Sequence, residues 1–337
     1  MSLYYRPLAQ CGPLRPPGAL PLAGGPVWFT HAARLTRGAA PVIVPADALP
    51  AALLELLTAP RAPLAGLSLD RPRLMGVLNV TPDSFSDGGL FNAPGTALAQ
   101  AVTLAREGAN ILDIGGESTR PGATPVGVAA EIARTAPVIA AIRRGFAGPI
   151  SIDTRKAAVG RAALAAGADM VNDVSALGFD ARMAELVVQS GAPVCLMHAF
   201  APPETMQDAP RYDDVLLDVH DALAGYVETA LAAGIAMERI VIDPGIGFGK
   251  TLEHNLALLA GLSLFHGLGC AILLGASRKR FIGTLGGGLV ARDRAAGSVG
   301  VALAAAAQGV QILRVHDMAD TRQALTLWQA AVNGVST

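Results

Sequence analysis

The chain has little charge and no surplus of either sign. Charged residues make up only 16% of its 337 residues, and 26 basic residues balance 27 acidic ones. The sequence therefore predicts neither a basic face for nucleic acid nor a polybasic segment for a membrane surface. Hydrophobic residues make up 52% of the chain, yet no apolar run free of charge, glycine and proline reaches the roughly 18 residues of a membrane span. We expect a globular protein with a large core.

Cysteine is also scarce. The three cysteines, Cys11, Cys195 and Cys270, lie far apart, which excludes the usual metal-binding spacings and fits a reduced protein of the cytoplasm. The N-terminus, MSLYYRPLAQ, has no basic stretch followed by an apolar run, so no secretory signal peptide is expected.

Lysine is scarcer than arginine by far. The three lysines are Lys156, Lys250 and Lys279, and each follows a short apolar run. A lysine ammonium is a compact charge that a planar guanidinium cannot imitate at a tight site. The placement hints that these lysines have specific roles.

Residues 1–64 differ in pattern from residues 65–337. The first segment holds many prolines and short apolar pieces, with a helix expected over 47–57 and Asp47 as its N-cap. It carries no motif with recognisable chemistry. We interpret it as an N-terminal extension or small appended subdomain, the alternative being a partly disordered arm.

From residue 74 onward, short apolar runs alternate with Ala- and Leu-rich helical stretches. The runs are 74–79, 110–114, 150–153, 169–172, 193–197, 240–243, 271–274 and 311–315. The predicted helices are 96–108, 127–144, 156–166, 180–190, 213–233, 253–261, 292–307 and 318–333. Eight strand-helix units predict an α/β fold, a (β/α)8 TIM barrel with a small N-terminal extension. An open, doubly wound sheet is the alternative.

Functional residues of such a barrel lie at the C-terminal ends of its strands. Polar or charged side chains occupy or closely follow all eight predicted ends: Asn79, Asp113, Asp153, Asn172, His198, Asp243, Lys279, and Arg314 with His316. We expect these side chains to converge on one mouth of the barrel and to form a site there.

The motifs at these ends identify a resemblance. They are GVLNVTPDSFSDGG (76–89), LDIGGESTRPGA (112–123), SIDTRK (151–156), VNDVSAL (171–177), IDPGIGFGKT (242–251), GASRKRFIG (275–283), AGSV (296–299) and RVHD (314–317). Residues 66–334 resemble the dihydropteroate synthases. The resemblance implies condensation of a (7,8-dihydropterin-6-yl)methyl diphosphate with p-aminobenzoate, a need for Mg²⁺, and a homodimer. One departure is MHAFAPPETMQ (197–207), where Phe200 and Ala201 make a bulkier, less polar turn than the family usually has.

The resemblance also implies roles for individual residues. The pterin would be bound by Asp153, Asn172, Asp243 and Lys279. The diphosphate would be bound by Asn79, Thr119, Arg120, Arg314, Val315 and His316. The p-aminobenzoate slot would be formed by Phe85, Thr119, Pro121, Phe248 and Ser277. Asn79 would bind Mg²⁺, assisted by Asp87 or, through water, by Asp113, and catalysis would depend on Lys279, Asp113, Arg314 and His316.

Two other functions are open to a barrel of this kind. A pterin-binding barrel that only holds its ligand, or that transfers a methyl group, also uses Asp and Asn at its strand ends but has no diphosphate to bind. A paralogue that has lost activity is a third interpretation. The SRK, RVHD and STRPG motifs, all present here, favour the synthase.

Overall fold

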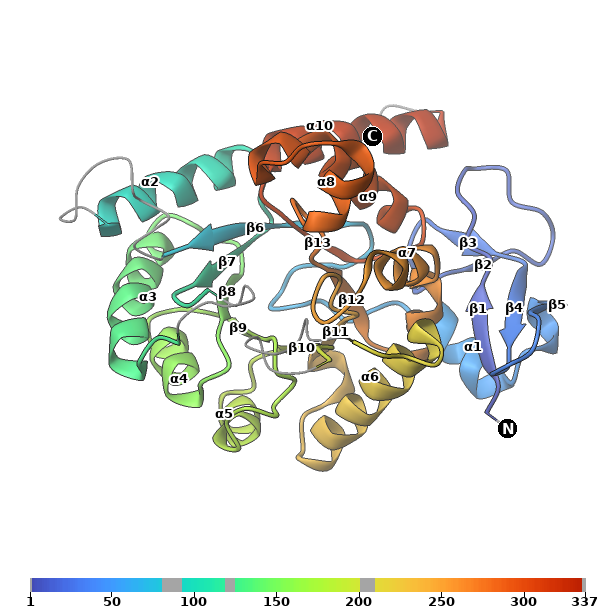
Figure 1. Cartoon of the computed structure of the whole chain (residues 1–337), viewed down its shortest axis with the longest axis horizontal. Helices are drawn as coiled ribbons and strands as arrows, with labels where there is room; N and C mark the ends of the chain where they lie inside the picture. The colour runs from blue at the N-terminus through green and yellow to red at the C-terminus, as the bar shows by residue number, and fades with distance from the viewer. Residues whose placement is uncertain (1, 81–92, 119–124, 201–209, 335–337) are drawn as a thin grey trace.

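The computed structural model describes residues 2–80, 93–118, 125–200 and 210–334. Eight parallel strands close into a barrel in the order β10-β11-β12-β13-β6-β7-β8-β9 (Figure 1). The strands are β6 (Arg73–Asn79), β7 (Ile111–Gly115), β8 (Ile150–Asp153), β9 (Met170–Asp173), β10 (Val194–Met197), β11 (Ile240–Asp243), β12 (Ala271–Leu274) and β13 (Ile312–Val315). The predicted (β/α)8 barrel is confirmed, and the open sheet is excluded because β13 pairs with β6.

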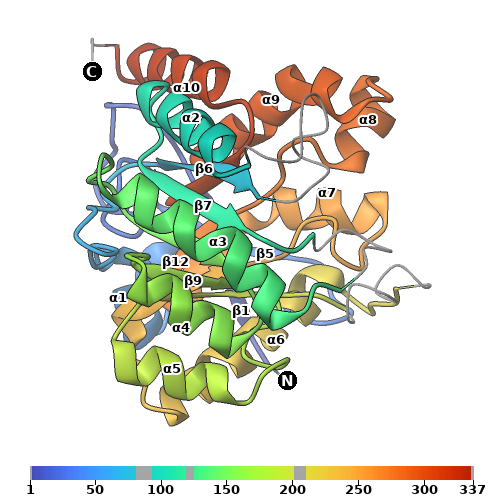
Figure 2. The ribbon, with the colours of Figure 1, turned by 90° about the vertical axis from the view of Figure 1, so that its left-hand side faces the viewer.

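Helices surround the strands, as Figure 2 shows for α2 to α5. All eight predicted helices are present: α2 (Ala93–Arg106), α3 (Val128–Arg143), α4 (Ala157–Ala165), α5 (Arg182–Ser190), α6 (Val215–Ala232), α7 (Leu252–Ala260), α9 (Ala295–Ala306) and α10 (Met318–Asn333). The short helix α8 (Arg280–Gly286) and the 3₁₀ turns η3 (Met237–Arg239), η4 (Leu262–Leu268) and η5 (Ala291–Arg294) were not predicted. They are too short to show a helical period in the sequence. No helix in these described ranges is long and apolar enough to cross a bilayer.

The barrel interior is apolar at its N-terminal end and polar at its mouth. Buried side chains from alternate strand positions fill the lower part: Met75, Ile111, Met170, Cys195, Val241, Leu273 and Ile312. Leu64 and Leu69, which precede the first barrel strand, pack against this cluster and close the bottom. The next inward-facing positions are those expected to form the site, because side chains alternate along a strand.

The N-terminal segment folds into strands and one helix against one side of the barrel (Figure 1). Strands β1 (Tyr4–Pro7), β4 (His31–Leu35) and β5 (Val42–Pro45) form an antiparallel sheet, and β2 (Leu20–Pro21) pairs with β3 (Trp28–Phe29). A turn η1 (Ala46–Ala48) and the helix α1 (Ala51–Thr58) follow. A core that includes Leu22, Val27, Phe29 and Leu57 supports these elements, so the segment is not a disordered arm.

The predicted start of the helix in this segment is wrong. Asp47 lies in η1, and α1 begins three residues after that turn, at Ala51, with no side-chain cap. Two residues of the expected helix, Asp47 and Ala48, belong to a separate turn because a new helix starts after Pro50. Proline is well suited to the N-terminus of a helix and poorly suited to its interior.

Candidate active site

Four predicted site residues form one hydrogen-bonded group at the mouth of the barrel. Arg314 Nε lies 2.6 Å from Asp113 Oδ2, and Arg314 Nη2 lies 2.9 Å from Asp153 Oδ2. Asn172 Nδ2 donates to Asp113 Oδ2 at 3.2 Å. The four residues come from β7, β8, β9 and β13, so barrel closure brings together groups up to 201 positions apart in the sequence.

One guanidinium thus serves two buried carboxylates. Burial raises the pKa of Asp153 to about 7, against the attraction of Arg314, and repulsion from Asp113 adds to the rise. Asp113 Oδ1 is buried and has no hydrogen-bond partner in the described part of the chain. The cluster therefore has acceptor capacity that its own residues do not use.

Asp243 presents one carboxylate oxygen to the mouth. Its Oδ1 accepts a hydrogen bond from the Gly245 amide at 2.7 Å. A Cβ at Gly275 would lie 3.5 Å from Oδ2, so the lack of a side chain there leaves that oxygen accessible. Burial raises the pKa of Asp243, and Lys279 opposes this rise. Asp243 does not cap the next helix, because Thr251 and His254 form a capping box at α7.

Lys279 faces this carboxylate from the loop after β12. Its Nζ lies 4.2 Å from the centroid of the Phe248 ring and contacts the Ile246 carbonyl. Burial lowers the pKa of Lys279 to about 7, while Asp243 opposes the shift. A lysine of this kind can donate a hydrogen bond with or without its charge.

The other two lysines hold loops in place. Lys250 Nζ is buried and donates to the carbonyls of Gly245 and Phe248 at 2.9 and 3.0 Å, and its hydrogen bond with His198 Nδ1 is 3.0 Å long. Burial lowers the pKa of Lys250 to about 7 and that of His198, aided by Lys250, to about 3.

Lys156 binds two glutamates. Its Nζ lies 2.6 Å from Glu131 Oε2 and 3.0 Å from Glu117 Oε1. The structure therefore separates Lys279, which adjoins Asp243, from two lysines with bracing contacts.

His316 and Ser277 are neighbours. Ser277 Oγ accepts from the His316 amide at 3.2 Å and lies 3.1 Å from His316 Nδ1. Val315, between Arg314 and His316, is buried, which leaves its backbone as the group to contact a ligand.

Arg278 was not singled out in the sequence. It has a φ of +60°, a conformation that costs free energy for a residue with a Cβ. Its amide donates to Ser298 Oγ at 2.9 Å, and its Nε lies 3.0 Å from Asp317 Oδ2. Arg278 thereby fixes the loop that carries Ser277 and Lys279. The signal was available, since these residues lie in the SRK, AGSV and RVHD motifs.

Asn79 ends β6 beside a glycine on the neighbouring strand. A Cβ at Gly115 would lie 3.6 Å from Asn79 Oδ1 and 3.9 Å from Asp153 Oδ2. Glycine at this position leaves space between the two oxygen groups. The remaining predicted site residues lie outside the described residues: Phe85, Asp87, Thr119, Arg120 and Pro121.

Comparison with known proteins identifies the family to which this chain belongs. The model of a family described as "Pterin binding enzyme" matches residues 75–316. The dihydropteroate synthase of Neisseria meningitidis serogroup B is 48% identical over 269 residues, covering 78% of this chain and 94% of the relative. The chain belongs to the dihydropteroate synthase family. The family's Escherichia coli K12 member is 44% identical over 267 residues, covering 79% of this chain and 94% of its own.

Solved dihydropteroate synthases have the same fold. The Xanthomonas albilineans enzyme with 4-aminobenzoic acid superposes with a TM-score of 0.76 at 50% identity, covering 81% of this chain and 98% of its own. The same enzyme in complex with 7,8-dihydropteroate gives 0.74 at 47% identity with the same coverage. The family model begins at residue 75, so the N-terminal segment lies outside it.

Proposed function

We propose that this chain is a transferase that condenses (7,8-dihydropterin-6-yl)methyl diphosphate with p-aminobenzoate, giving 7,8-dihydropteroate and diphosphate for folate biosynthesis. The observation that carries the proposal is the position of Asp243, Lys279, Asp153 and Asn172 at one end of the barrel, in or after the strands β11, β12, β8 and β9. The proposal is also supported by the 44–48% sequence identity of this chain to dihydropteroate synthases over most of its length.

The pterin would bind through its flat amide-and-amine edge. That edge offers two parallel donors, which suit the accessible oxygen of Asp243 and a second acceptor. Lys279 Nζ would donate to the ring carbonyl, and Asp153 and Asn172 would complete the polar rim. Asp153, with its pKa raised to about 7, could accept or donate a hydrogen bond near neutral pH.

The diphosphate would bind on the side of Arg314 and His316. His316 lies beside Ser277, and Arg314 is already oriented by two carboxylates. Thr119, Arg120 and Val315 are assigned to the same group by resemblance. The positive charges and the backbone amides of this group of residues would stabilise the negative charge that develops on the leaving group.

Magnesium is part of this proposal. Asn79 supplies an oxygen ligand of the kind that Mg²⁺ prefers, and Gly115 leaves the space in front of it open. These residues fit an ion that takes most of its other ligands from water and diphosphate. When bound, the ion would neutralise diphosphate charge.

The chemistry needs orientation more than a strong base. The aniline nitrogen of p-aminobenzoate forms a bond to the methylene carbon, the bond from that carbon to the diphosphate oxygen breaks, and the nitrogen loses one proton. The electron-rich pterin can stabilise positive charge on the methylene carbon, so bond breaking can precede attack. Phe248 and Ser277 would line the p-aminobenzoate slot, and the site would orient both reactants and exclude water.

We also propose that the chain works in the cytoplasm as a homodimer, with small-molecule substrates and no nucleic-acid partner. The dimer follows from the family resemblance. The exposed side chains of Leu285, Leu289 and Val290 at and after α8 offer apolar surface for a second copy. Sedimentation velocity on the full chain tests this directly, and a concentration-independent monomer would contradict it.

One assay tests the reaction. The purified full chain is incubated with the pterin diphosphate, p-aminobenzoate and Mg²⁺, and dihydropteroate is measured by chromatography and mass spectrometry. We expect product that depends on all three additions. Binding of the pterin without product would instead favour the non-catalytic barrel.

A further inference from the structure

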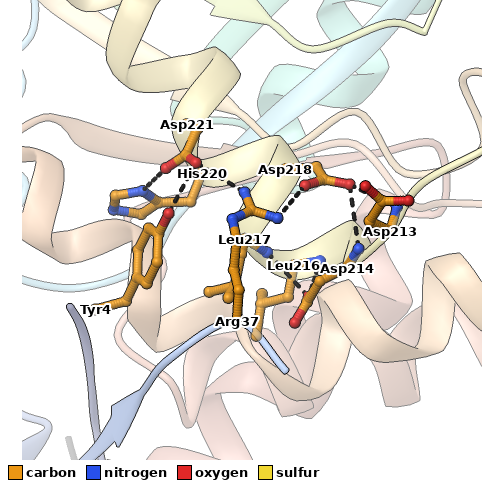
Figure 3. Close-up of polar contacts among 9 residues, drawn as sticks. All are labelled: Tyr4, Arg37, Asp213, Asp214, Leu216, Leu217, Asp218, His220 and Asp221. Carbon is orange, nitrogen blue, oxygen red and sulfur yellow. Dashed lines mark hydrogen bonds and ion pairs between the residues drawn. The ribbon is translucent and has the colours of Figure 1, made fainter. Parts of the chain in front are cut away.

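The N-terminal segment reaches one helix of the barrel through two ion pairs. Arg37 Nη1 lies 2.5 Å from Asp218 Oδ1, and Arg37 Nη2 lies 2.8 Å from Asp221 Oδ2 (Figure 3). Tyr4 also donates its hydroxyl hydrogen to Asp221 Oδ2, at 2.8 Å. Both carboxylates stand in the first turns of α6, which begins at Val215.

The two carboxylates differ in what they contact next. Asp218 Oδ2 accepts hydrogen bonds from the backbone amides of Asp213 and Asp214, at 3.0 and 3.2 Å (Figure 3). Asp221 contacts its neighbour His220, at 3.4 Å. Asp218 therefore connects Arg37 to the residues just before α6. Besides Arg37 and Tyr4, Asp221 makes a polar contact only with this neighbour within the helix, in the part of the chain that the structure describes.

Tyr212, which directly precedes Asp213, connects this end of α6 to the active site. Tyr212 donates its hydroxyl hydrogen to the Gly249 carbonyl at 2.9 Å. Its ring lies against the rings of Phe200, at 5.5 Å, and His254, at 4.9 Å.

Gly249 lies between Phe248 and Lys250, each of which contacts other residues of the site. Lys250 follows it and binds the carbonyls of Gly245 and Phe248, while Gly245 donates to Asp243. The Phe248 ring faces the ammonium of Lys279. Thus Tyr212 contacts the loop that connects the proposed pterin carboxylate to the proposed p-aminobenzoate wall.

From this series of contacts we infer that Arg37 is a positioning residue for the active site. Through Asp218 it fixes Asp213 and Asp214, which hold Tyr212 against the 243–250 loop and set the position of Phe248. The N-terminal segment, which lies outside the family model, thereby contributes to substrate binding. The inference rests on the proposed function, because Phe248 is assigned to the p-aminobenzoate slot.

The solvent exposure of the Arg37–Asp218 ion pair determines how large an effect its removal should have. Arg37 and Asp218 have exposed side-chain fractions of 41% and 26%, and ion pairs this exposed add little to the free energy of unfolding. A purely structural role would therefore change neither the melting temperature nor the kinetics appreciably. A positioning role predicts a KM for p-aminobenzoate raised about three- to tenfold, since residues remote from a ligand alter its binding by about this much.

Two matched variants separate these roles. Asp218→Ala and Asp221→Ala each remove one carboxylate partner of Arg37, but Asp218→Ala alone also removes the acceptor for Asp213 and Asp214. Arg37→Met removes both ion pairs. We expect Arg37→Met and Asp218→Ala to raise the KM for p-aminobenzoate with kcat and melting temperature near those of the wild type. Asp221→Ala should behave as the wild type.

The combined variant and the wild type complete the test. Arg37→Met with Asp218→Ala should raise the KM no further than either single change, because both act through one contact. Equal KM values in Arg37→Met, Asp221→Ala and the wild type would overturn the inference, as would multiplicative effects in the combined variant. Absence of dihydropteroate formation by the wild type would instead overturn the proposed function, so the two failures are distinguishable.

Discussion

Arg314 Nε lies 2.6 Å from Asp113 Oδ2, deep in the mouth of the barrel. This ion pair joins β13 to β7 across β6, and the same guanidinium also holds Asp153. Asp113 is fully buried, and its Oδ2 accepts hydrogen bonds from this partner and from Asn172. The proposed diphosphate ligand Arg314 is thus oriented by carboxylates before any substrate arrives.

Replacing Asp113 should change the ionisation of Asp153. In Asp113→Asn a repelling charge is removed and Arg314 keeps Asp153 as its carboxylate partner. Since repulsion from Asp113 contributes to the raised pKa of Asp153, the pKa of Asp153 should fall. Carbon-detected NMR of the carboxyl groups measures this change, and an unchanged or higher pKa of Asp153 would contradict it. Activity should fall at least about tenfold because Arg314 loses one of the two carboxylate charges that orient it.

Asp153 should also make the free energy of unfolding depend on pH. Its pKa is about 7 in the folded chain and about 4 in an unfolded one. A carboxyl with a raised pKa contributes stability that is fully present below the unfolded value and is lost as pH rises through the folded one. Between about pH 4 and pH 7, the wild type should therefore lose stability relative to Asp153→Asn. Denaturant unfolding of both proteins across this range is the measurement, and a parallel pH dependence would refute the assignment.

Lys279 should be essential to activity and dispensable for folding. Lys279→Gln removes the ammonium next to Asp243 and Phe248. Loss of a charged hydrogen bond in a dry site costs about 2–4 kcal/mol, or about 30–1000-fold in kcat/KM. Steady-state kinetics and circular dichroism check the two halves of this prediction. Activity within about threefold of the wild type would show that Lys279 has no such role.

The barrel could be predicted from the sequence because its strands and helices are local patterns with strong signals. Each short apolar run ends near a polar residue, and each helix such as α6 has enough turns to show its period. The same rule placed Asp153, Asn172 and Asp243 at one mouth, since parallel strands in a barrel share one C-terminal edge.

What the sequence could not show depends on contacts between distant residues. No local pattern indicates that Arg314 faces Asp113 and Asp153, or that two of the three lysines hold loops. Arg278 was missed although it lies in the SRK motif, because its partners Ser298 and Asp317 are 20 and 39 positions away. The contact of Arg37 with Asp218, 181 positions apart, was missed for the same reason.

Replacing Arg61, another arginine of the N-terminal segment, should give the opposite result to replacing Arg37. Arg61 donates to four backbone carbonyls, those of Leu56, Ala59, His266 and Cys270, at 2.9–3.1 Å. Two of these acceptors lie in or next to η4, and burial lowers the pKa of Arg61 to about 10. Arg61→Met would leave several of these carbonyls without a partner, at a cost of about 1.5–3 kcal/mol.

We therefore expect Arg61→Met to lower the melting temperature by several degrees and to leave the KM for p-aminobenzoate unchanged. Two of its contacts lie in or just after α1, and the other two lie before β12, at the N-terminal end of the barrel. Those of Arg37 lead instead to the 243–250 loop at the mouth. Differential scanning calorimetry and steady-state kinetics on Arg37→Met and Arg61→Met together give the comparison. A raised KM in Arg61→Met at full stability would mean that the N-terminal segment acts on the site through η4 and not through α6.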